Sequence, residues 1–423
     1  MRNVFSINNL KKIALFAILL LAIFQIASVL YFDGFQLSND QQAYIDIAKS
    51  CLTQDKWYPY GTHNMRTDYI FAPAYVNLLI LYYKIFNTFS GFAFVNIMLS
   101  FAILGEVYLI TKKLFSQKAA LISVILYCAT YSNWFVHIGY FTELPFMFCM
   151  MSAVAICVCA EKLRWYFLAG IFLALGNWAR PLAIAFLAGI LVFIFFREKF
   201  VHRQILVLVS SVALTIAIIG GIAKYNCAMF VFQSTTSGIN LAGSANHKAN
   251  GLVGFDYNTD SFYKENLPAN YKQLNLVQRD KALRKVAIKW ILENPMKYIA
   301  TIPAKCAVFF GFDTWSERFQ LKDGLSAIRD GKNKTNLVLY CVKLFFKSLV
   351  FYAVMMLTLY YIWQNRHQLF TYKNAILLIA FFVAGLTLPF MITDRYHYPM
   401  MPILWIFASQ GMLLLLQKQE AEG

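Results

Sequence analysis

The sequence predicts an all-α protein that crosses a membrane many times. Hydrophobic residues make up 59% of its 423 residues and charged residues only 14%, whereas soluble domains carry about a quarter charged residues. Several apolar runs are long enough to cross the roughly 30 Å hydrocarbon core of a bilayer as helices. Because these runs are continuously apolar rather than alternating, a membrane β-barrel is excluded.

Ten apolar runs are long and uninterrupted, and we expect them to be the spans. They cover residues 13–31, 90–111, 119–138, 143–160, 165–178, 181–196, 204–224, 347–363, 374–392 and 397–417. The first run is longer than a signal-peptide core, so we expect an uncleaved helix there. Two further runs, 71–87 and 296–312, are shorter and are interrupted by proline and by polar or basic residues.

The positive-inside rule decides whether the two interrupted runs cross, because short cytoplasmic loops are enriched in Lys and Arg. If neither crosses, the cytoplasmic segments contain Arg2, Lys11, Lys12, Lys112, Lys113, Lys118, Lys162, Arg164, Arg197, Lys199, Arg203, Arg366, Lys373 and Lys418. If both cross, the eight basic residues from Lys112 to Arg203 lie outside instead. We therefore expect ten spans in the inner (plasma) membrane, with both termini cytoplasmic. The interrupted runs are then juxtamembrane helices in the outer interface.

This topology gives one integral-membrane domain, 1–423, with two large exported loops at 32–89 and 225–345. We interpret the glycines of the second loop as turns, since no G-x-x-x-x-G-K-[ST] phosphate loop is present. They are Gly238, Gly243, Gly251 and Gly254. The sequence also leaves open a disulfide among Cys51, Cys227, Cys306 and Cys341.

The net charge of +17 reflects membrane orientation first and contact with anionic lipids second. No RNA-binding signature and no long basic tail accompany it. We therefore expect membrane lipids, and no nucleic acid, among the partners.

Acidic residues appear where the chain leaves the membrane after the first span. The stretch 32–48 contains Asp33, Asp40 and Asp46, and a carboxylate near the bilayer is costly and usually functional. We interpret Asp33 as part of the turn that leaves the membrane and Asp46 as a helix-surface charge. Asp40 remains as the candidate functional carboxylate.

Further charged residues fall on the same side of the predicted membrane. Glu143, Arg180 and Arg395 lie in turns between spans, and Lys305 lies in the second juxtamembrane run. Each has a structural alternative: Glu143 can be a favourable charge at a helix N-terminus, and the arginines can extend to headgroups. Together, however, a carboxylate can act as a general base, and cations can bind a departing phosphate. The set predicts transfer from a lipid-phosphate donor.

Two other polar residues are expected to be structural. Glu106 lies in the second span within reach of Lys112 and Lys113, which favours an ion pair. His397 is interpreted as a packed interfacial histidine. The spacing of the remaining histidines suggests no metal site.

Several short segments resemble those of a known group of enzymes. They are FDG…ND-x-x-x-Y-x-x-x-A at 32–48, FAPAYVNLL at 71–79, YFTELPF at 140–146, NWARPLA at 177–183, SGINLAG at 237–243, ENPMKYIATIPAK at 293–305 and DRYHYPMMP at 394–402. In this order, the chain resembles the integral-membrane glycosyltransferases of the GT-C fold. The resemblance is to bacterial relatives of protein O-mannosyltransferases and lipid A aminoarabinose transferases, glycosyltransferase family 39.

The resemblance implies a GT-C bundle of about ten transmembrane helices that transfers a sugar, with inversion, on the exported side. It implies a polyprenyl-phosphate-linked sugar as donor and a lipid, glycan or protein as acceptor. By motif match, Asp40 takes the place of the essential first-loop aspartate and Glu143 that of the second acidic position. Arg395, assisted by Arg180, falls where the family contacts the donor phosphate. The expected donor-binding set also includes Tyr44, Lys305 and Tyr396.

The first loop departs from the mannosyltransferases, because Asn39-Asp40 stands where they have a paired Asp-Glu. This departure leaves metal use and a protein acceptor open. We assign no metal ligands, and a divalent metal is the one cofactor left open.

Other functions compete with this interpretation. A surface-polysaccharide polymerase or ligase also joins sugars at the exported face. A lipid-linked sugar transporter or flippase would need polar residues near the midplane and often inverted repeats, whereas here the charges lie at span ends. A structural membrane protein would tolerate neutralisation of these charges one at a time.

Overall fold

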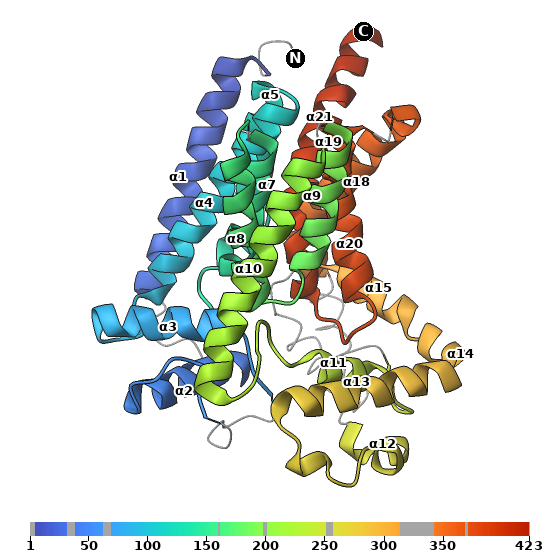
Figure 1. Ribbon diagram of the computed structural model, residues 1–423. Helices are drawn as coiled ribbons and strands as arrows, with labels where there is room; N and C mark the ends of the chain where they lie inside the picture. Colours follow the sequence, from blue (N-terminus) through green and yellow to red (C-terminus); the bar gives the residue numbers. More distant parts are fainter. Residues whose placement is uncertain are drawn as a thin grey trace.

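The long apolar helices run side by side in one bundle (Figure 1). The structure is a computed structural model that describes residues 5–31, 39–61, 69–159, 161–197, 201–250, 257–313, 342–368 and 371–422. The bundle contains α1 (Ile7–Tyr31), α4 (Phe92–Leu114), α5 (Gln117–Ala129), α7 (Glu143–Cys159), α8 (Leu163–Ala179), α9 (Ala183–Arg197), α10 (Val201–Cys227), α18 (Leu349–Gln364), α19 (Tyr372–Ala375), α20 (Leu378–Thr387) and α21 (Met401–Glu422).

The described helices include several that can cross a membrane. By length and composition, α1, α4, most of α10 and the segment Arg395–Ala421 each suffice alone, and shorter apolar helices such as α7 and α9 accompany them. Large apolar side chains point outward from the bundle, among them Phe16 and Leu30 of α1 and Leu206 of α10, each about two-thirds exposed. Lipid replaces water around such side chains. The chain is thus an all-α membrane protein, as predicted.

A second group of helices lies at one end of this bundle (Figure 1): α2 (Asn39–Thr53), α3 (Pro73–Phe86), α11 (Ser237–Ser244), α12 (Ser261–Asn266), α13 (Leu276–Glu293) and α14 (Pro295–Ile299). The start of α1 and the end of α21 lie at the opposite end. The short elements are α6 (Ser132–Phe135), η1 (Tyr257–Thr259), η2 (Tyr271–Gln273), η3 (Arg366–Gln368) and η4 (Asp394–Met400).

The two interrupted apolar runs do not follow the bundle axis. Helix α3, from the run 71–87, lies across the axis, and α15 (Ile302–Gly311) runs obliquely from α14 back to the bundle (Figure 1). This arrangement agrees with juxtamembrane helices. It does not by itself identify the side of the membrane, so the exported position of this end stays a prediction.

Local sequence signals explain where several helices begin and end. Ser116 accepts a hydrogen bond from the backbone of Ala119 and caps α5. Asn275 and Gln278 form a capping box at the start of α13. Such caps satisfy backbone N–H groups that have no partner within the helix.

Two smaller apolar cores hold the end helices in place. The first joins α2 and α3 to the end of α10, with Tyr44, Tyr75 and Cys227 buried in it. The second joins α11, α12 and α13 around Tyr263 and Trp290. The helices around the site are therefore packed rather than loosely attached.

The structure shortens two of the expected spans. The run 119–138 ends as a helix at Ala129, because its polar residues bind the other end of the chain: Trp405 donates to Thr130, and Tyr398 donates to Asn133. The run 374–392 is divided into α19 and α20, which are separated at 376–377.

The interpretation of the glycines as turns is wrong for two of them. Gly238 and Gly243 lie inside α11. A Cβ on Gly238 would come within 2.2 Å of the Asp280 carbonyl oxygen, so glycine there lets α11 and α13 approach closely. Gly251 and Gly254 lie outside the described residues.

Three of the four cysteines in the expected exported loops can be assessed. Cys51, Cys227 and Cys306 are free thiols. Cys341 lies outside the described residues, as does Asp33.

Candidate active site

Four charged side chains form a continuous chain of ion pairs at the end of the bundle that holds α2 and α3. Arg395 Nη2 donates to Asp40 Oδ2 at 2.6 Å. The Nε atom of the same Arg395 lies 3.6 Å from Glu143 Oε1, and Arg180 Nη1 lies 2.5 Å from that oxygen. The order is therefore Asp40, Arg395, Glu143, Arg180, with the charges alternating in sign.

Helix α2 places Asp40 by two contacts with other parts of the chain. Gln41 accepts a hydrogen bond from the backbone of Tyr140 at 3.0 Å, next to the start of α7. One turn later, Tyr44 stacks on Phe71 with ring centroids 4.6 Å apart and meets Tyr75 edge-on at 5.1 Å. Asp40 lies in the first turn of α2, so these contacts fix its carboxylate relative to Glu143.

The loop before Glu143 is held by buried polar side chains. Asn96 of α4 donates to the carbonyl oxygens of His137 and Gly139, both at 3.0 Å. Ser28 of α1 bonds the His137 ring at 2.7 Å. Glu143 then begins α7, where the positive end of the helix dipole favours its negative charge.

Arg180 extends toward Glu143 because a proline ends its helix. Pro181 disfavours the helical conformation in the residue before it. Helix α8 accordingly ends at Ala179, and Arg180 adopts an extended backbone with φ −145° and ψ 136°. Its guanidinium lies over the Tyr396 ring, 5.3 Å from the centroid.

Arg395 sits in η4, a short 3₁₀ segment that leads into α21. Its guanidinium lies over the ring of Phe141 at 4.8 Å and near Tyr396 at 5.9 Å. Tyr398 of the same segment donates to Asn133 at 2.7 Å and so fixes η4 in place. Arg395 and Glu143 are thus both held through contacts with the segment between α5 and α7.

His397 follows Arg395 in η4 and is fully buried, as its interpretation as a packed histidine expected. Its ring stacks on Phe351 at 4.7 Å, and its Nε2 lies 3.5 Å from the buried carboxylate of Asp313. Asp313 also accepts from the Ser132 backbone at 3.2 Å. This pair ties η4 to the end of α15 and to α6.

Water reaches the four charges unequally. The side chain of Glu143 is 2% exposed, those of Arg180 and Arg395 are 14% and 16% exposed, and that of Asp40 is 42% exposed. An incoming hydroxyl can therefore meet Asp40 but not Glu143. The arginines lie between these two extremes.

The other expected site residues divide into two groups. Tyr44 and Tyr396 lie beside the four charges, and burial together with the nearby Asp40 carboxylate raises the pKa of Tyr44 well above its usual value. Lys305 lies elsewhere: it donates to Ser244 at 2.5 Å and to the Pro389 carbonyl at 3.2 Å, under the ring of Tyr298. Its role in phosphate binding stays a prediction.

Two residues near the charges were not singled out from the sequence. Phe141 lies against Arg395. Tyr75 is fully buried, and no described residue pairs with its hydroxyl. Both lie within segments that matched the family pattern, FAPAYVNLL and YFTELPF, but an aromatic residue beside an apolar run carries no further signal.

The two carboxylates of the site are both paired with arginine. Among the described residues, no three His, Cys, Asp or Glu side chains gather closely enough to hold an ion. Arg395 contacts one oxygen of Asp40, and Arg180 contacts one oxygen of Glu143. No step below therefore runs through a metal.

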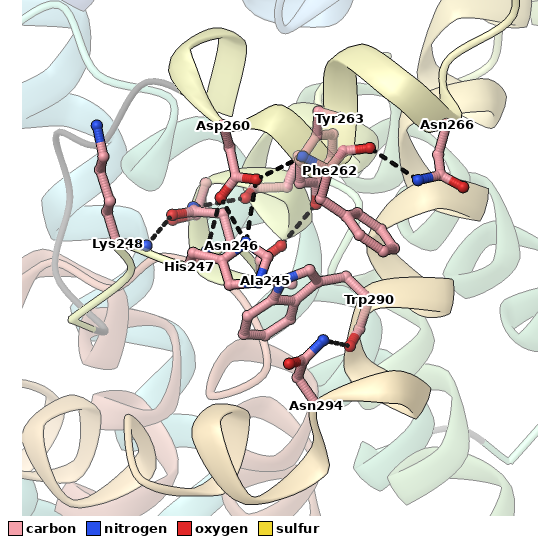
Figure 2. A network of polar contacts seen from close by, with 12 residues as sticks. Ala245, Asn246, His247, Lys248, Asp260, Phe262, Tyr263, Asn266, Trp290 and Asn294 are labelled. Carbon is pink, nitrogen blue, oxygen red and sulfur yellow. Dashed lines mark hydrogen bonds and ion pairs between the residues drawn. The ribbon is translucent and has the colours of Figure 1, made fainter.

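A second polar network lies in the end helices, around His247 and Asp260 (Figure 2). The buried Asp260 carboxylate accepts from the backbones of His247 at 2.7 Å and Phe262 at 2.9 Å, and it contacts the His247 ring at 3.2 Å. Burial opposes the charge, but these bonds outweigh it and lower the pKa of Asp260. The network joins residues that follow α11 to the start of α12.

Comparison with known proteins identifies the fold. Residues 71–220, about a third of the chain, match the family described as dolichyl-phosphate-mannose-protein mannosyltransferase. The apo structure of the Archaeoglobus fulgidus oligosaccharyltransferase superposes with a TM-score of 0.54 at 16% identity, over 97% of this chain and 51% of that one. This chain has the GT-C fold of integral-membrane glycosyltransferases.

Two further structures of that archaeal enzyme show the same GT-C likeness. Its complex with Zn and sulfate gives a TM-score of 0.53 at 16% identity, over 96% of this chain and 49% of that chain. The complex of the enzyme, AglB, with an inhibitory peptide and a dolichol-phosphate gives 0.50 at 15% identity, over 96% and 50%. The chain thus spans about half the length of the oligosaccharyltransferase. None of the curated proteins compared with it matches.

Proposed function

We propose that this GT-C protein is an inverting glycosyltransferase that moves a sugar from a polyprenyl-phosphate-linked donor to an acceptor hydroxyl at the exported face. The observation that carries the proposal is the chain of ion pairs from Asp40 to Arg180 at the membrane-surface end of the bundle. It combines an accessible carboxylate with two fixed guanidinium groups. A base and a phosphate-binding cation are the two groups that this transfer requires.

In the proposed reaction, Asp40 accepts the proton of the acceptor hydroxyl. The hydroxyl oxygen forms a bond to the anomeric carbon while the bond from that carbon to the phosphate oxygen breaks. The phosphate leaves with the electron pair, and Arg395 and Arg180 stabilise its charge. A single displacement inverts the anomeric centre, so no covalent intermediate with the enzyme forms.

During this reaction Arg395 can pair either with Asp40 or with the donor phosphate. In the structure it donates to Asp40 Oδ2. A donor phosphate offers oxygens that a guanidinium binds at least as well as a carboxylate. When Arg395 turns to the phosphate, Asp40 Oδ2 is left free to accept the proton of the acceptor hydroxyl. Donor binding would therefore activate the base.

Glu143 would hold the two guanidinium groups in place rather than react. It lies between them and is almost inaccessible to water. The segment from about 234 to 250, which includes α11, would cover the site and help to choose the sugar. Its Thr235 is hydrogen-bonded to Ile70, beside the segment that contacts Tyr44.

The test is Asp40→Asn, with Asp46→Asn as a matched control on the same helix. Asp46 accepts from Gln42 and has no contact with the arginines. Sugar transfer from a polyprenyl monophosphate donor is measured with purified protein. We expect Asp40→Asn to lose about 10²- to 10⁴-fold in rate, the usual contribution of a general base, with unchanged expression. Asp46→Asn keeps full activity.

The donor and the acceptor discriminate this function from its alternatives. Full activity of Asp40→Asn would refute the assigned base. A requirement for a diphosphate-linked oligosaccharide would instead support a polysaccharide polymerase or ligase. Transport of a labelled lipid-linked sugar without a new glycosidic bond would support a flippase. Mass spectrometry of the lipid that copurifies with the protein identifies the donor directly.

A further inference from the structure

The helices α13 and α14 present a face that no described residue covers. Helix α13 buries Leu283, Val286, Ala287 and Trp290 against α11 and α12. On its opposite side, Lys281, Lys285, Ile288 and Leu292 follow one another at spacings of four, three and four residues, which places them on one helix face. Met296 and Ile299 follow on α14 and are exposed apolar side chains as well. We call these six residues the outer face of α13–α14.

The outer face is strongly exposed. Leu292 is 75% exposed, Met296 74% and Ile299 55%. Single exposed apolar residues are common on proteins, but a contiguous apolar stripe on a helix marks an interaction surface. Lys281 and Lys285 are exposed as well.

The segment carries a large excess of positive charge. Between 276 and 299 the basic residues are Arg279, Lys281, Arg284, Lys285, Lys289 and Lys297, and the acidic residues are Asp280 and Glu293. Asp280 is used within the fold, because it accepts from Ser237 and from the backbone of Gly238. Glu293 lies 3.8 Å from Lys289. Within the described chain, no carboxylate pairs with Lys281 or Lys285.

Charge and apolar surface are separated along the outer face. The lysines occupy the N-terminal half of α13, and the apolar residues occupy its C-terminal end and α14. In Figure 1, α13 lies across the bundle axis, and α14 and α15 lead from its C-terminal end back to the bundle. The apolar residues therefore lie at the end of α13 that α14 and α15 connect to the bundle.

We infer that the outer face of α13–α14 docks on the surface of a bilayer that contains anionic phospholipid. Leu292, Met296 and Ile299 enter the boundary between headgroups and acyl chains. Lys281 and Lys285 lie over the phosphate groups. This is the binding mode of an interfacial amphipathic helix with cations on its polar side.

Charge complementarity favours a lipid surface over a second copy of the chain. In a symmetric dimer through this face, the same patch meets itself. The lysines of one copy would then approach those of the other, which is unfavourable. An anionic lipid surface supplies the opposite charge.

The test measures how fast individual lysines of the full-length protein are acetylated by a soluble reagent, with mass-spectrometric readout. The protein is placed in nanodiscs of phosphatidylcholine alone or of phosphatidylcholine with phosphatidylglycerol. Lys264 and Lys272 are internal controls, because they are exposed in the same loop but lie on α12 and η2. We expect phosphatidylglycerol to slow the acetylation of Lys281 and Lys285 several-fold. It should leave the two controls unchanged.

Two further measurements identify the occupant. High salt should abolish the protection, because it screens charges at the surface. The variant Leu292→Gln/Met296→Gln should lose part of the protection while keeping its thermal unfolding midpoint, since both side chains are exposed. Equal acetylation in both lipids, or an equal change at all four lysines, would overturn the inference. Protection in detergent that rises with protein concentration would point to a second copy and would also overturn it.

Discussion

At the scale of single residues, Asp40 and Glu143 differ in how much water reaches them. Both carboxylates contact Arg395, but only Asp40 also faces solvent. Removing one partner of a buried ion pair leaves an uncompensated charge, whereas an exposed pair contributes little. The two acids should therefore respond differently to the loss of their charge.

We predict that Glu143→Gln destabilises the protein and that Asp40→Asn does not. Glu143→Gln leaves Arg180 and Arg395 facing each other without the carboxylate between them, at a cost of roughly 3–5 kcal/mol. The measurement is the thermal unfolding midpoint in detergent, with expression level as a second readout. In the double variant Glu143→Gln/Arg180→Gln, part of the stability should return. Equal midpoints for Glu143→Gln and the unchanged protein would show that the charges do not support the fold.

The sequence placed the four charged residues at one end of the bundle, but it could not place Glu106. Its predicted ion pair is not present: Glu106 accepts from Ser152 of α7, and Lys112 lies over the ring of Tyr108 instead. Six residues along a helix turn the side chain by about 600°, which puts Lys112 on a different face of α4 from Glu106. Lys113 shares the face of Glu106 but lies about 10 Å further along the axis. An ion pair along a helix needs both the right direction and a short separation.

At the scale of elements, Lys305 connects three segments that surround the site. It lies on α15, donates to Ser244 at the end of α11, and donates to the Pro389 carbonyl shortly before η4. Burial lowers the pKa of Lys305 to about 8. The unfolded chain holds this proton more tightly, with a pKa of about 10.4. Between these two values, stability contributed by this group rises with pH.

We predict that the stability of the unchanged protein, measured relative to Lys305→Met, increases between pH 8 and 10. The cost of burying the charged amine is fully present below pH 8 and disappears as the amine loses its proton. The expected gain is roughly 1–2 kcal/mol. Thermal unfolding of both proteins across this pH range gives the difference. A difference that stays constant with pH would show that Lys305 keeps its charge at all these values.

The sequence predicted the helices that correspond to long apolar runs. It missed helices and helix ends that are determined by contacts with distant parts of the chain. The glycine-containing α11 is an example, because its local sequence favours turns. It is helical because Asp280 bonds its first residues and because α13 needs the close approach that Gly238 allows. The break of the run 119–138 has a similar origin, since Thr130 and Asn133 are used by residues near position 400.

At the scale of the whole molecule, the site lies where two different environments meet. The donor proposed here is a lipid and reaches the site from the bilayer, whereas the acceptor hydroxyl meets Asp40 from its exposed side. Because Arg395 pairs with Asp40 Oδ2, the proposed base gains this oxygen when a donor phosphate takes the arginine. This arrangement imposes an order on the two substrates.

We predict ordered addition, with the donor before the acceptor. Steady-state rates measured with both substrates varied should show polyprenyl phosphate as a competitive inhibitor against the donor and not against the acceptor. Arg395→Lys should weaken this order, because a lysine cannot bind a phosphate through two parallel bonds. Tight binding of the acceptor to protein free of donor would contradict the prediction.

The opposite ends of the bundle carry different parts of the chain. The four charges lie near α2, while the beginning of α1 and the end of α21 lie at the far end (Figure 1). A compartment that contains both chain ends therefore has no direct access to Asp40. Any water-soluble sugar nucleotide confined to that compartment cannot serve the site, however abundant it is. For the function proposed above, the activated sugar is attached to a carrier and moved across the bilayer before use, so synthesis of the donor and its use are separate steps on separate sides.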